Sequence, residues 1–372
     1  MKFLKALAVF LGTIIGVGIF GLPFIAFKAG FFVLAGYFVI MSVVAILVNI
    51  IYARVVLGTS GIHRFPGYVQ EYLGSSWKKF AFVITAVGLG GALLAYLIVG
   101  GNFLFACFGP IFGGGVIIYT LVFFVIGASL VYRGVKGISI IELILLFVLF
   151  FILVIFYIKA FPFININNFR SFDLGYIVFP YGVVLFSLWG TSIIPEIKEM
   201  LGSGVALKKV IVSGVVLSAM IYLFFVYIVQ GASLVVSEDA ISGLEQTIGS
   251  NIIRLGFLFG VITCFTSFLA LSLTLKKILW YDFGLNKNLA WFLTCFIPLG
   301  LFFLGFRKFI EVISFTGAVA LGIEAIIIVF LYKKFLVKKM FQKMNPLWYL
   351  LAGVFLLGIV LEFFLFYARI IT

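Results

Sequence analysis

Long apolar runs are the feature that most constrains how this chain of 372 residues can fold. In runs such as residues 140–158 almost every side chain is apolar, and hydrophobic residues make up 65% of the sequence against 10% charged residues. An average soluble domain is about 45–50% apolar and about 25% charged, so the composition excludes a water-soluble enzyme. A helix of about 20 apolar residues can cross a membrane with its backbone polar groups satisfied internally. The chain is therefore predicted to be an all-α polytopic membrane protein.

Hydropathy divides the chain into eleven segments, each a predicted spanning helix. No linker rich in proline or serine separates them, so residues 1–372 are expected to form a single transmembrane domain. The first segment lacks the small-residue cleavage site of a signal peptide and is interpreted as an uncleaved span. The spans are expected at about residues 6–27, 31–57, 79–107, 112–132, 138–158, 174–200, 206–230, 249–280, 288–304, 309–332 and 347–368.

Positive charge is distributed unequally between the two sides of this arrangement. With the N-terminus placed in the cytoplasm, 19 of the 26 lysines and arginines fall on the inner side and 7 on the outer side. Because cytoplasmic loops collect Lys and Arg, we expect a protein of the cytoplasmic membrane with its N-terminus inside and its C-terminus outside. The asymmetry explains most of the net charge of +14 without a nucleic acid partner. Cys107, Cys264 and Cys295 lie in or beside apolar runs, which favours neither disulfides nor a metal site.

The first and sixth spans contain helix-breaking residues at mid-depth. The first has four glycines and one proline within residues 12–23, and the sixth combines small, polar and proline residues within 179–196. Gly costs about 1 kcal/mol and Pro about 3 kcal/mol inside a helix, so both spans are predicted to be broken. A unit of five spans repeated once must be inverted in the membrane, and matched broken helices indicate the central site of a transporter. The repeats are expected at about residues 6–158 and 174–332, with a peripheral helix at about 347–368.

A break at this depth exposes backbone groups that lipid cannot satisfy. Freed N–H groups beside a positive helix end suit a carboxylate, and freed carbonyls suit an ammonium group or a sodium ion. A zwitterionic amino acid needs both, which makes it the predicted substrate. Residues 16–18 would present N–H groups, and carbonyls near Phe186, Ser187 and Trp189 would bind the amine.

The alternative interpretation is that the glycines of the first span form a packing seam between helices. The matched defect in the sixth span favours the binding site. The residues predicted to bind the substrate are Thr13, Gly16, Val17, Gly18, Tyr96, Phe186, Ser187, Trp189 and Gly190.

Both interrupted segments carry a family resemblance. Residues 12–23 (GTIIGVGIFGLP) and 186–196 (FSLWGTSIIPE) resemble amino acid permeases of the amino acid–polyamine–organocation superfamily, above all its amino acid/auxin and aromatic amino acid permease branches. The cytoplasmic stretches 66–74 and 133–137 are similar to the same group, and the resemblance extends to about residue 332. It implies the leucine-transporter fold of five plus five inverted helices and transport by alternating access.

The resemblance also implies a sodium site between the first and eighth spans. Ile19 stands where some relatives have an Asn for a second sodium ion, and an isoleucine side chain cannot coordinate one. The polar residues of the eighth span lie near one face of a helix, although such side chains can instead bond back to the preceding turn. The implied sodium ligands are Gly12, Ile15 and Thr263 through their carbonyls, and Thr266 and Ser267 through their hydroxyls.

Proton coupling is the rival interpretation. Certain relatives place a Lys in the fifth span, but residues 143–158 contain no charged side chain. The candidate carboxylates are Glu142 near the inner end of the fifth span and Glu324 in the tenth. An acid inside the membrane is costly and is a functional hypothesis by default. The alternatives are that Glu142, close to the interface, snorkels or pairs with Lys136, and that Glu324 has a structural pairing role.

The predicted function is secondary active transport of a small neutral or aromatic amino acid, coupled to Na⁺ or H⁺. No catalytic residue is expected, and the only expected cofactor is a sodium ion. One alternative is a membrane sensor that binds an amino acid at the same site. Another is a membrane enzyme acting on a lipid-linked substrate, which usually carries clustered acids, histidines or metal ligands at the membrane face. The sequence has no such cluster and does not define the oligomeric state.

Overall fold

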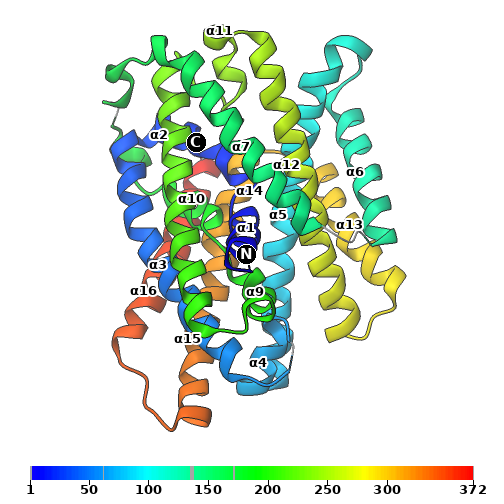
Figure 1. Cartoon of the computed structure of the whole chain (residues 1–372), viewed down its shortest axis with the longest axis vertical. Coiled ribbons are helices and arrows are strands. Elements are labelled where there is room, and N and C mark those ends of the chain that lie inside the picture. The colour runs from blue at the N-terminus through cyan, green and yellow to red at the C-terminus, as the bar shows by residue number, and fades with distance from the viewer. Residues whose placement is uncertain (1, 62, 135–137, 171, 372) are drawn as a thin grey trace.

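Long apolar helices run side by side through most of the molecule (Figure 1). The computed structural model describes residues 2–61, 63–134, 138–170 and 172–371, and it describes no side chains for 138–143 and 366–371. Within these residues every regular element is a helix, which confirms the predicted all-α class. Eight of the described segments are long and apolar enough to cross a membrane. They are α3 (Phe31–Gly58), α5 (Ser75–Phe112), α6 (Val116–Arg133), Ile144–Phe163 with most of α7 (Ile138–Ala160), α10 (Gly204–Ala232), Ser250–Asp282 with α12 (Ser250–Lys277), Phe309–Met340, and Leu347–Leu365 of α16 (Leu347–Ile371).

The two spans predicted to be broken are interrupted. The first consists of α1 (Lys2–Ile14) and α2 (Gly18–Ala29), which are bent by 55° and count together as a ninth span. The sixth consists of α8 (Pro180–Ser187), the 3₁₀ turn η4 (Thr191–Ile193) and α9 (Ile194–Leu201). The predicted total of eleven is not confirmed, because α8 and α9 have only 8 residues each and α13 (Lys287–Phe303) has 17.

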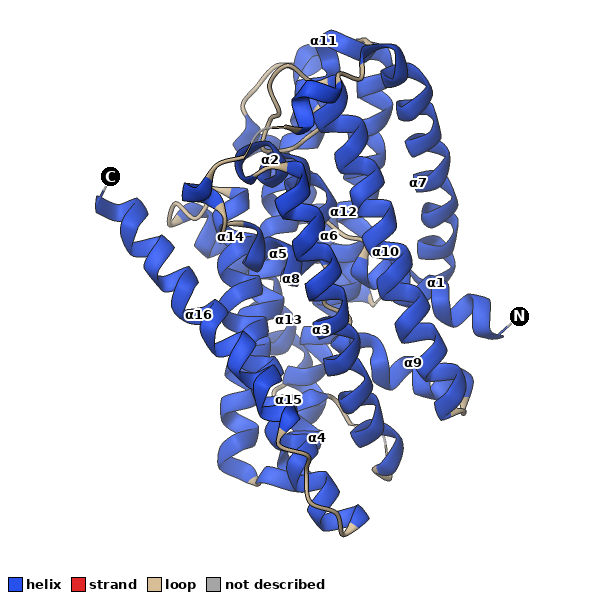
Figure 2. Cartoon of the chain, turned by 90° about the vertical axis from the view of Figure 1, so that its left-hand side faces the viewer, coloured by secondary structure: helices blue, strands red, loops and turns tan. Residues whose placement is uncertain are grey.

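Burial separates the central helices from those that face lipid. In α5 the most apolar window is 61% buried, whereas the corresponding windows of α7 and α16 are 22% buried. α5 packs against α12, α6, α4 (Phe65–Leu73) and α13, while α10 packs against α3, α1 and α2. Figure 2 shows α16 along one edge of the molecule and the N-terminal end of α1 projecting at the opposite edge. The centre of the bundle therefore lies where α5, α10 and α12 meet the two broken spans.

A π-helix interrupts the span at Phe309–Met340. It is η7 (Thr316–Leu321), between α14 (Phe309–Phe315) and α15 (Gly322–Phe335), and a second π-helix, η8 (Leu336–Met340), follows α15. A Cβ added at Gly317 would overlap the carbonyl of Gly182, so the backbones of η7 and α8 are in direct contact. The remaining short elements are η1 (Phe161–Phe163), η2 (Ile166–Phe169), η3 (Leu174–Tyr176), η5 (Ser242–Leu244), α11 (Glu245–Ile248) and η6 (Ile278–Asp282).

Candidate functional site

The first break packs directly against helices α5 and α8. A Cβ added at Gly16 would collide with the hydroxyl of Tyr96, and a Cβ added at Gly18 would collide with the side chain of Ser187. Only glycine allows this approach, because any other residue would push the break away from its neighbours. Gly18 therefore brings the backbone of the first broken span against the second, and Gly16 brings it against α5.

Two backbone donors are free at this break. The N–H of Gly16 donates to the carbonyl of Ile14 at 2.9 Å, and the N–H of Phe20 donates to the carbonyl of Val17 at 3.1 Å. The N–H groups of Val17 and Gly18 find no acceptor among the described residues. They lie at the N-terminus of α2, where the helix dipole favours negative charge. A carboxylate fits this position.

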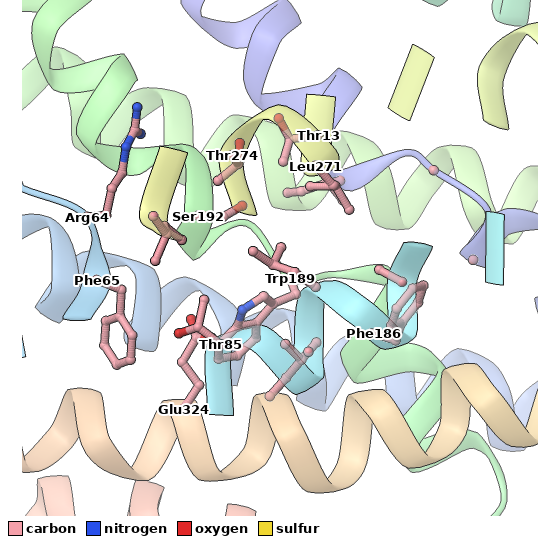
Figure 3. Close-up of a pocket in the computed structure, with 18 of the residues that line it drawn as sticks. Thr13, Arg64, Phe65, Thr85, Phe186, Trp189, Ser192, Leu271, Thr274 and Glu324 are labelled. Atoms are coloured by element: carbon pink, nitrogen blue, oxygen red, sulfur yellow. The ribbon is translucent and has the colours of Figure 1, made fainter. Parts of the chain in front are cut away.

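A cavity joins the two breaks to α5, α12 and α15 (Figure 3). Of the residues predicted to bind substrate, Thr13, Gly16, Gly18, Tyr96, Phe186 and Trp189 line it. Val17, Ser187 and Gly190 lie at the breaks but outside the lining, and the Ser187 hydroxyl donates back to the carbonyl of Val183 at 2.8 Å. In Figure 3 the cavity extends from Phe186 at one end to Arg64 and Phe65 at the other.

Sequence reasoning missed much of this lining. Thr85, Gly88 and Ala92 lie at helical spacing on one face of α5 with Tyr96, which was predicted. That pattern could have been found in the sequence. The other missed lining residues are Ile14, Tyr52, Arg64, Phe65, Leu89, Ser192, Leu271, Thr274, Ile278 and Leu321.

Glu324 is the acid in the wall of this cavity. It is 5% exposed, and the hydroxyl of Thr191 donates to its Oε1 at 2.7 Å. The side chain of Trp189 is a second hydrogen-bond partner and lies beside Glu324 in Figure 3. Within the described part of the chain no Lys or Arg forms an ion pair with it. The side chain of Glu142, the other predicted proton carrier, lies outside the described residues, as do residues 135–137 of the cytoplasmic stretch 133–137.

A second, smaller cavity contains the implied sodium ligands. Gly12, Ile15, Thr263, Thr266 and Ser267 all line it. The hydroxyl of Thr266 donates to the carbonyl of Thr263 at 3.1 Å, so part of the oxygen set is used within the helix. Apolar side chains complete the wall, namely Ile19, Leu145, Leu146, Leu149 and Phe259. Among the described residues of this cavity, the atoms that could bind a metal ion are hydroxyl and carbonyl oxygens, which suit a hard cation.

At the Arg64 end of the main cavity, polar contacts connect separate elements. Arg64, which precedes α4, forms an ion pair with Glu196 of α9. The ammonium group of Lys198, also on α9, donates to the carbonyls of Val56 at 2.7 Å and Thr59 at 3.2 Å. These bonds cap the C-terminus of α3 and tie it to α9.

Some of the carbonyls expected to bind the amine are already occupied. The carbonyl of Phe186 accepts the N–H of Trp189 at 3.4 Å, and the carbonyl of Ser187 accepts the hydroxyl of Tyr222 at 3.0 Å. Tyr222 is a further residue that sequence reasoning missed. Its hydroxyl also lies 2.7 Å from the carbonyl oxygen of Ile14, in the first span.

Comparison with known proteins gives a consistent result. No curated protein sequence matches the chain significantly. Among solved structures, MhsT in complex with L-phenylalanine is similar with a TM-score of 0.70 and 16% identity, over 97% of this chain and 98% of that chain. Mhp1, a nucleobase-cation-symport-1 family transporter, is similar in a closed conformation with bromovinylhydantoin bound (TM-score 0.67, 13% identity, 92% of this chain and 80% of that chain). It is also similar in its inward-facing conformation (TM-score 0.71, 12% identity, 98% and 89%).

These likenesses confirm the expected leucine-transporter type of fold. A model of the tryptophan/tyrosine permease family matches residues 1–371, nearly the whole chain. The predictions of a multi-pass membrane protein and of a secondary amino acid transporter rather than an enzyme are thereby confirmed. This chain belongs to the tryptophan/tyrosine permease family.

Proposed function

We propose that this permease carries an aromatic amino acid, tryptophan or tyrosine, across the cytoplasmic membrane by alternating access. The observation that carries the proposal is the cavity that Gly18 of the first break lines together with Phe186 and Trp189 of the second. The N–H groups of Gly18 and of Val17, directly before it, have no acceptor among the described residues. The family and the phenylalanine bound in MhsT support the same class of substrate.

The cavity has a place for each part of such a substrate. The N–H groups of Val17 and Gly18 bind the carboxylate. The carbonyl of Thr13 binds the ammonium group, because the Val17 N–H that would occupy it in a continuous helix does not bond to it. The aromatic ring packs among Phe186, Trp189 and apolar residues such as Leu271, where ring-to-ring contacts add to simple burial.

The membrane placement is part of the same proposal. The excess of Lys and Arg on one side supports a cytoplasmic N-terminus and an external C-terminus. Residues 6–158 and 174–332 form the two inverted repeats, and the helix at 347–368 is peripheral. The two breaks then lie at corresponding places in the two repeats, where a rocking motion exposes the cavity to each side in turn.

For coupling, we favour a proton carried by Glu324. Its carboxyl group lies in the cavity wall without a cationic partner among the described residues. Binding a proton removes an uncompensated charge from the membrane interior. The second candidate is a sodium ion in the cavity of Gly12 and Thr263, which is favoured because all five implied ligands meet there.

Uptake by proteoliposomes tests the proposal. Labelled L-tryptophan, L-tyrosine and glycine are supplied under a proton gradient, with sodium present or replaced by choline, to wild type and to Thr266→Ala. We expect uptake of the two aromatic amino acids and exclusion of glycine. Uptake that needs sodium and is lost in Thr266→Ala would assign coupling to the second cavity. Binding of tryptophan without uptake would identify a sensor, and uptake of neither aromatic amino acid under any gradient would contradict the function.

A further inference from the structure

One tyrosine hydroxyl connects the two broken spans. Tyr222 lies on α10 and is fully buried. Its hydroxyl oxygen is 2.7 Å from the carbonyl oxygen of Ile14 and 3.0 Å from that of Ser187. Ile14 is the last residue of α1, and Ser187 is the last residue of α8. The hydroxyl therefore meets each broken helix at its C-terminus.

The chemistry of these helix ends explains why a donor is needed between them. The last carbonyls of a helix have no partner within the helix and carry partial negative charge. The Ile14 carbonyl accepts one N–H from outside its helix, that of Gly16 at 2.9 Å, and keeps a second lone pair for Tyr222. Two such ends that converge on one point repel each other, and in hydrocarbon no water relieves them. A phenolic O–H supplies one hydrogen, which the two carbonyls share in a three-centre bond. Tyr222 thus occupies the place that a small cation or an ammonium group would otherwise take.

The surroundings hold this hydroxyl in position. α10 continues without a break over 29 residues, so it does not bend with the broken spans. The ring of Tyr222 packs 5.8 Å from the ring of Phe38 on α3. Eight residues earlier on α10, Gly214 has no side chain and leaves room for Phe10 of α1, which brings α1 close to α10. The donor is therefore fixed on a continuous helix, and the two helix ends are positioned against it.

We propose that Tyr222 is a positioning residue for substrate binding. Its hydroxyl holds the ends of α1 and α8, and so keeps Gly18 at the start of α2 in one cavity with Phe186 and Trp189. It also makes a cation between the two breaks unnecessary, which leaves coupling to Glu324 or to the second cavity. This inference rests on the transport function proposed above.

The test changes the donor at position 222 and little else. Tyr222→Phe removes the hydroxyl. Incorporation of p-aminophenylalanine at position 222 restores a donor with two hydrogens, whereas p-methylphenylalanine restores the volume without a donor. Tyr227→Phe is the matched control, because Tyr227 lies on the same helix and packs on Phe169 rather than against either break. Uptake of L-tryptophan gives KM and the maximal rate, and the rise in Tm with L-tryptophan reports binding independently of flux.

We expect the KM of Tyr222→Phe to rise about tenfold, as for the loss of one buried hydrogen bond, with a smaller change in maximal rate. The p-methyl protein should match Tyr222→Phe, the p-amino protein should return to within about threefold of wild type, and Tyr227→Phe should equal wild type. A KM for Tyr222→Phe within twofold of wild type, or full recovery with the p-methyl residue, would overturn the inference. Absence of uptake by wild type would contradict the transport function instead, and the Tm shifts of the same variants would still decide the role of Tyr222.

Discussion

The two broken spans both interrupt a helix inside the molecule, but they differ in the chemical groups at the break. The first break, at residues 15–17, is made of small and apolar residues and leaves backbone N–H groups without an acceptor among the described residues. The second, at residues 188–193, is longer, contains the 3₁₀ turn η4 and presents the side chains of Trp189 and Thr191. At the first break Gly16 and Gly18 allow close approach because they have no side chain, and at the second break side chains bind Glu324.

This difference indicates that the two breaks bind different parts of the substrate. Backbone donors recognise a group that all amino acids share, the carboxylate, and they cannot be altered without moving the chain. Side chains at the second break contact the variable part of the substrate and the acid proposed to carry the proton. We therefore expect small changes of volume to be most harmful at the first break, and changes of polarity to be most informative at the second.

The largest effect is expected for Gly18→Ala. The added methyl group would press against the Cβ and Cα of Ser187 as well as its hydroxyl, so α2 and α8 must separate. Overpacking of this kind costs about 1–3 kcal/mol, and we expect uptake of L-tryptophan to fall roughly 100-fold. The measurement is initial uptake per amount of protein in the membrane. Gly36→Ala on α3 is the control, because a Cβ at Gly36 meets nothing within 4 Å. Normal uptake by Gly18→Ala would remove the first break from the binding site.

Glu324→Gln tests the acid at the second break. The amide keeps the shape of the side chain and can still accept from Thr191, but it does not exchange a proton at physiological pH. Uptake driven by an acidic exterior is expected to fall about tenfold and to lose its dependence on the proton gradient. Glu71→Gln, at an exposed position beside Lys338, should behave as wild type. If the gradient dependence survives in Glu324→Gln, the proton is carried elsewhere.

Thr191→Val has a smaller expected effect. The substitution keeps the volume but removes the donor to Glu324, so the carboxyl group keeps only its bond with Trp189. The loss of one such bond corresponds to about 1 kcal/mol, or roughly a fivefold rise in the KM for L-tryptophan. Thr294→Val on α13 is the matched control, since its hydroxyl donates back to the carbonyl of Ala290 at 2.7 Å. Equal KM values for the two variants would show that the second break does not act through its side chains.

The smallest effect is expected for Glu238, an acidic residue outside both breaks that serves as a comparison with Glu324. In the loop after α10, partial burial raises the pKa of Glu238, and Glu311 adds to the rise while Lys308 opposes it. The native state therefore binds this proton more tightly than the unfolded state. Its stabilising contribution is complete below the unfolded value of 4.5 and is lost as the pH rises through the native pKa.

Glu238→Gln lacks this titration. We expect it to be slightly more stable than wild type at pH 7, by less than about 0.5 kcal/mol, with the difference vanishing near pH 4. The Tm of the purified protein at the two pH values measures this. A variant that is less stable than wild type at pH 7 would contradict the assigned direction, and a changed KM would show that the loop reaches the binding site.

Features that depend on local sequence were predictable, and those that depend on distant contacts were not. The breaks follow from glycines and prolines inside apolar runs, and the face of α5 that lines the cavity repeats at helical spacing. The contacts of Tyr222 join residues 208 and 35 positions apart in the chain, and nothing near Tyr222 marks it as different from other buried tyrosines. The count of eleven spans is not confirmed, because hydropathy registers an apolar segment without its helical length, which is only 17 residues in α13.

The π-helix η7 has a consequence for how Glu324 is aimed. A π turn holds about one residue more than an α turn, and each residue in an α-helix corresponds to a rotation of about 100°. The π-helix Thr316–Leu321 therefore rotates the side chains of α15 about the helix axis, and Glu324 lies three residues past the end of η7. If one residue were deleted from η7 and the helix became regular, the carboxyl group would swing away from the cavity toward a neighbouring helix. A deletion of one residue in η7 would therefore remove the Glu324 side chain from the cavity wall, although Glu324 itself is unchanged.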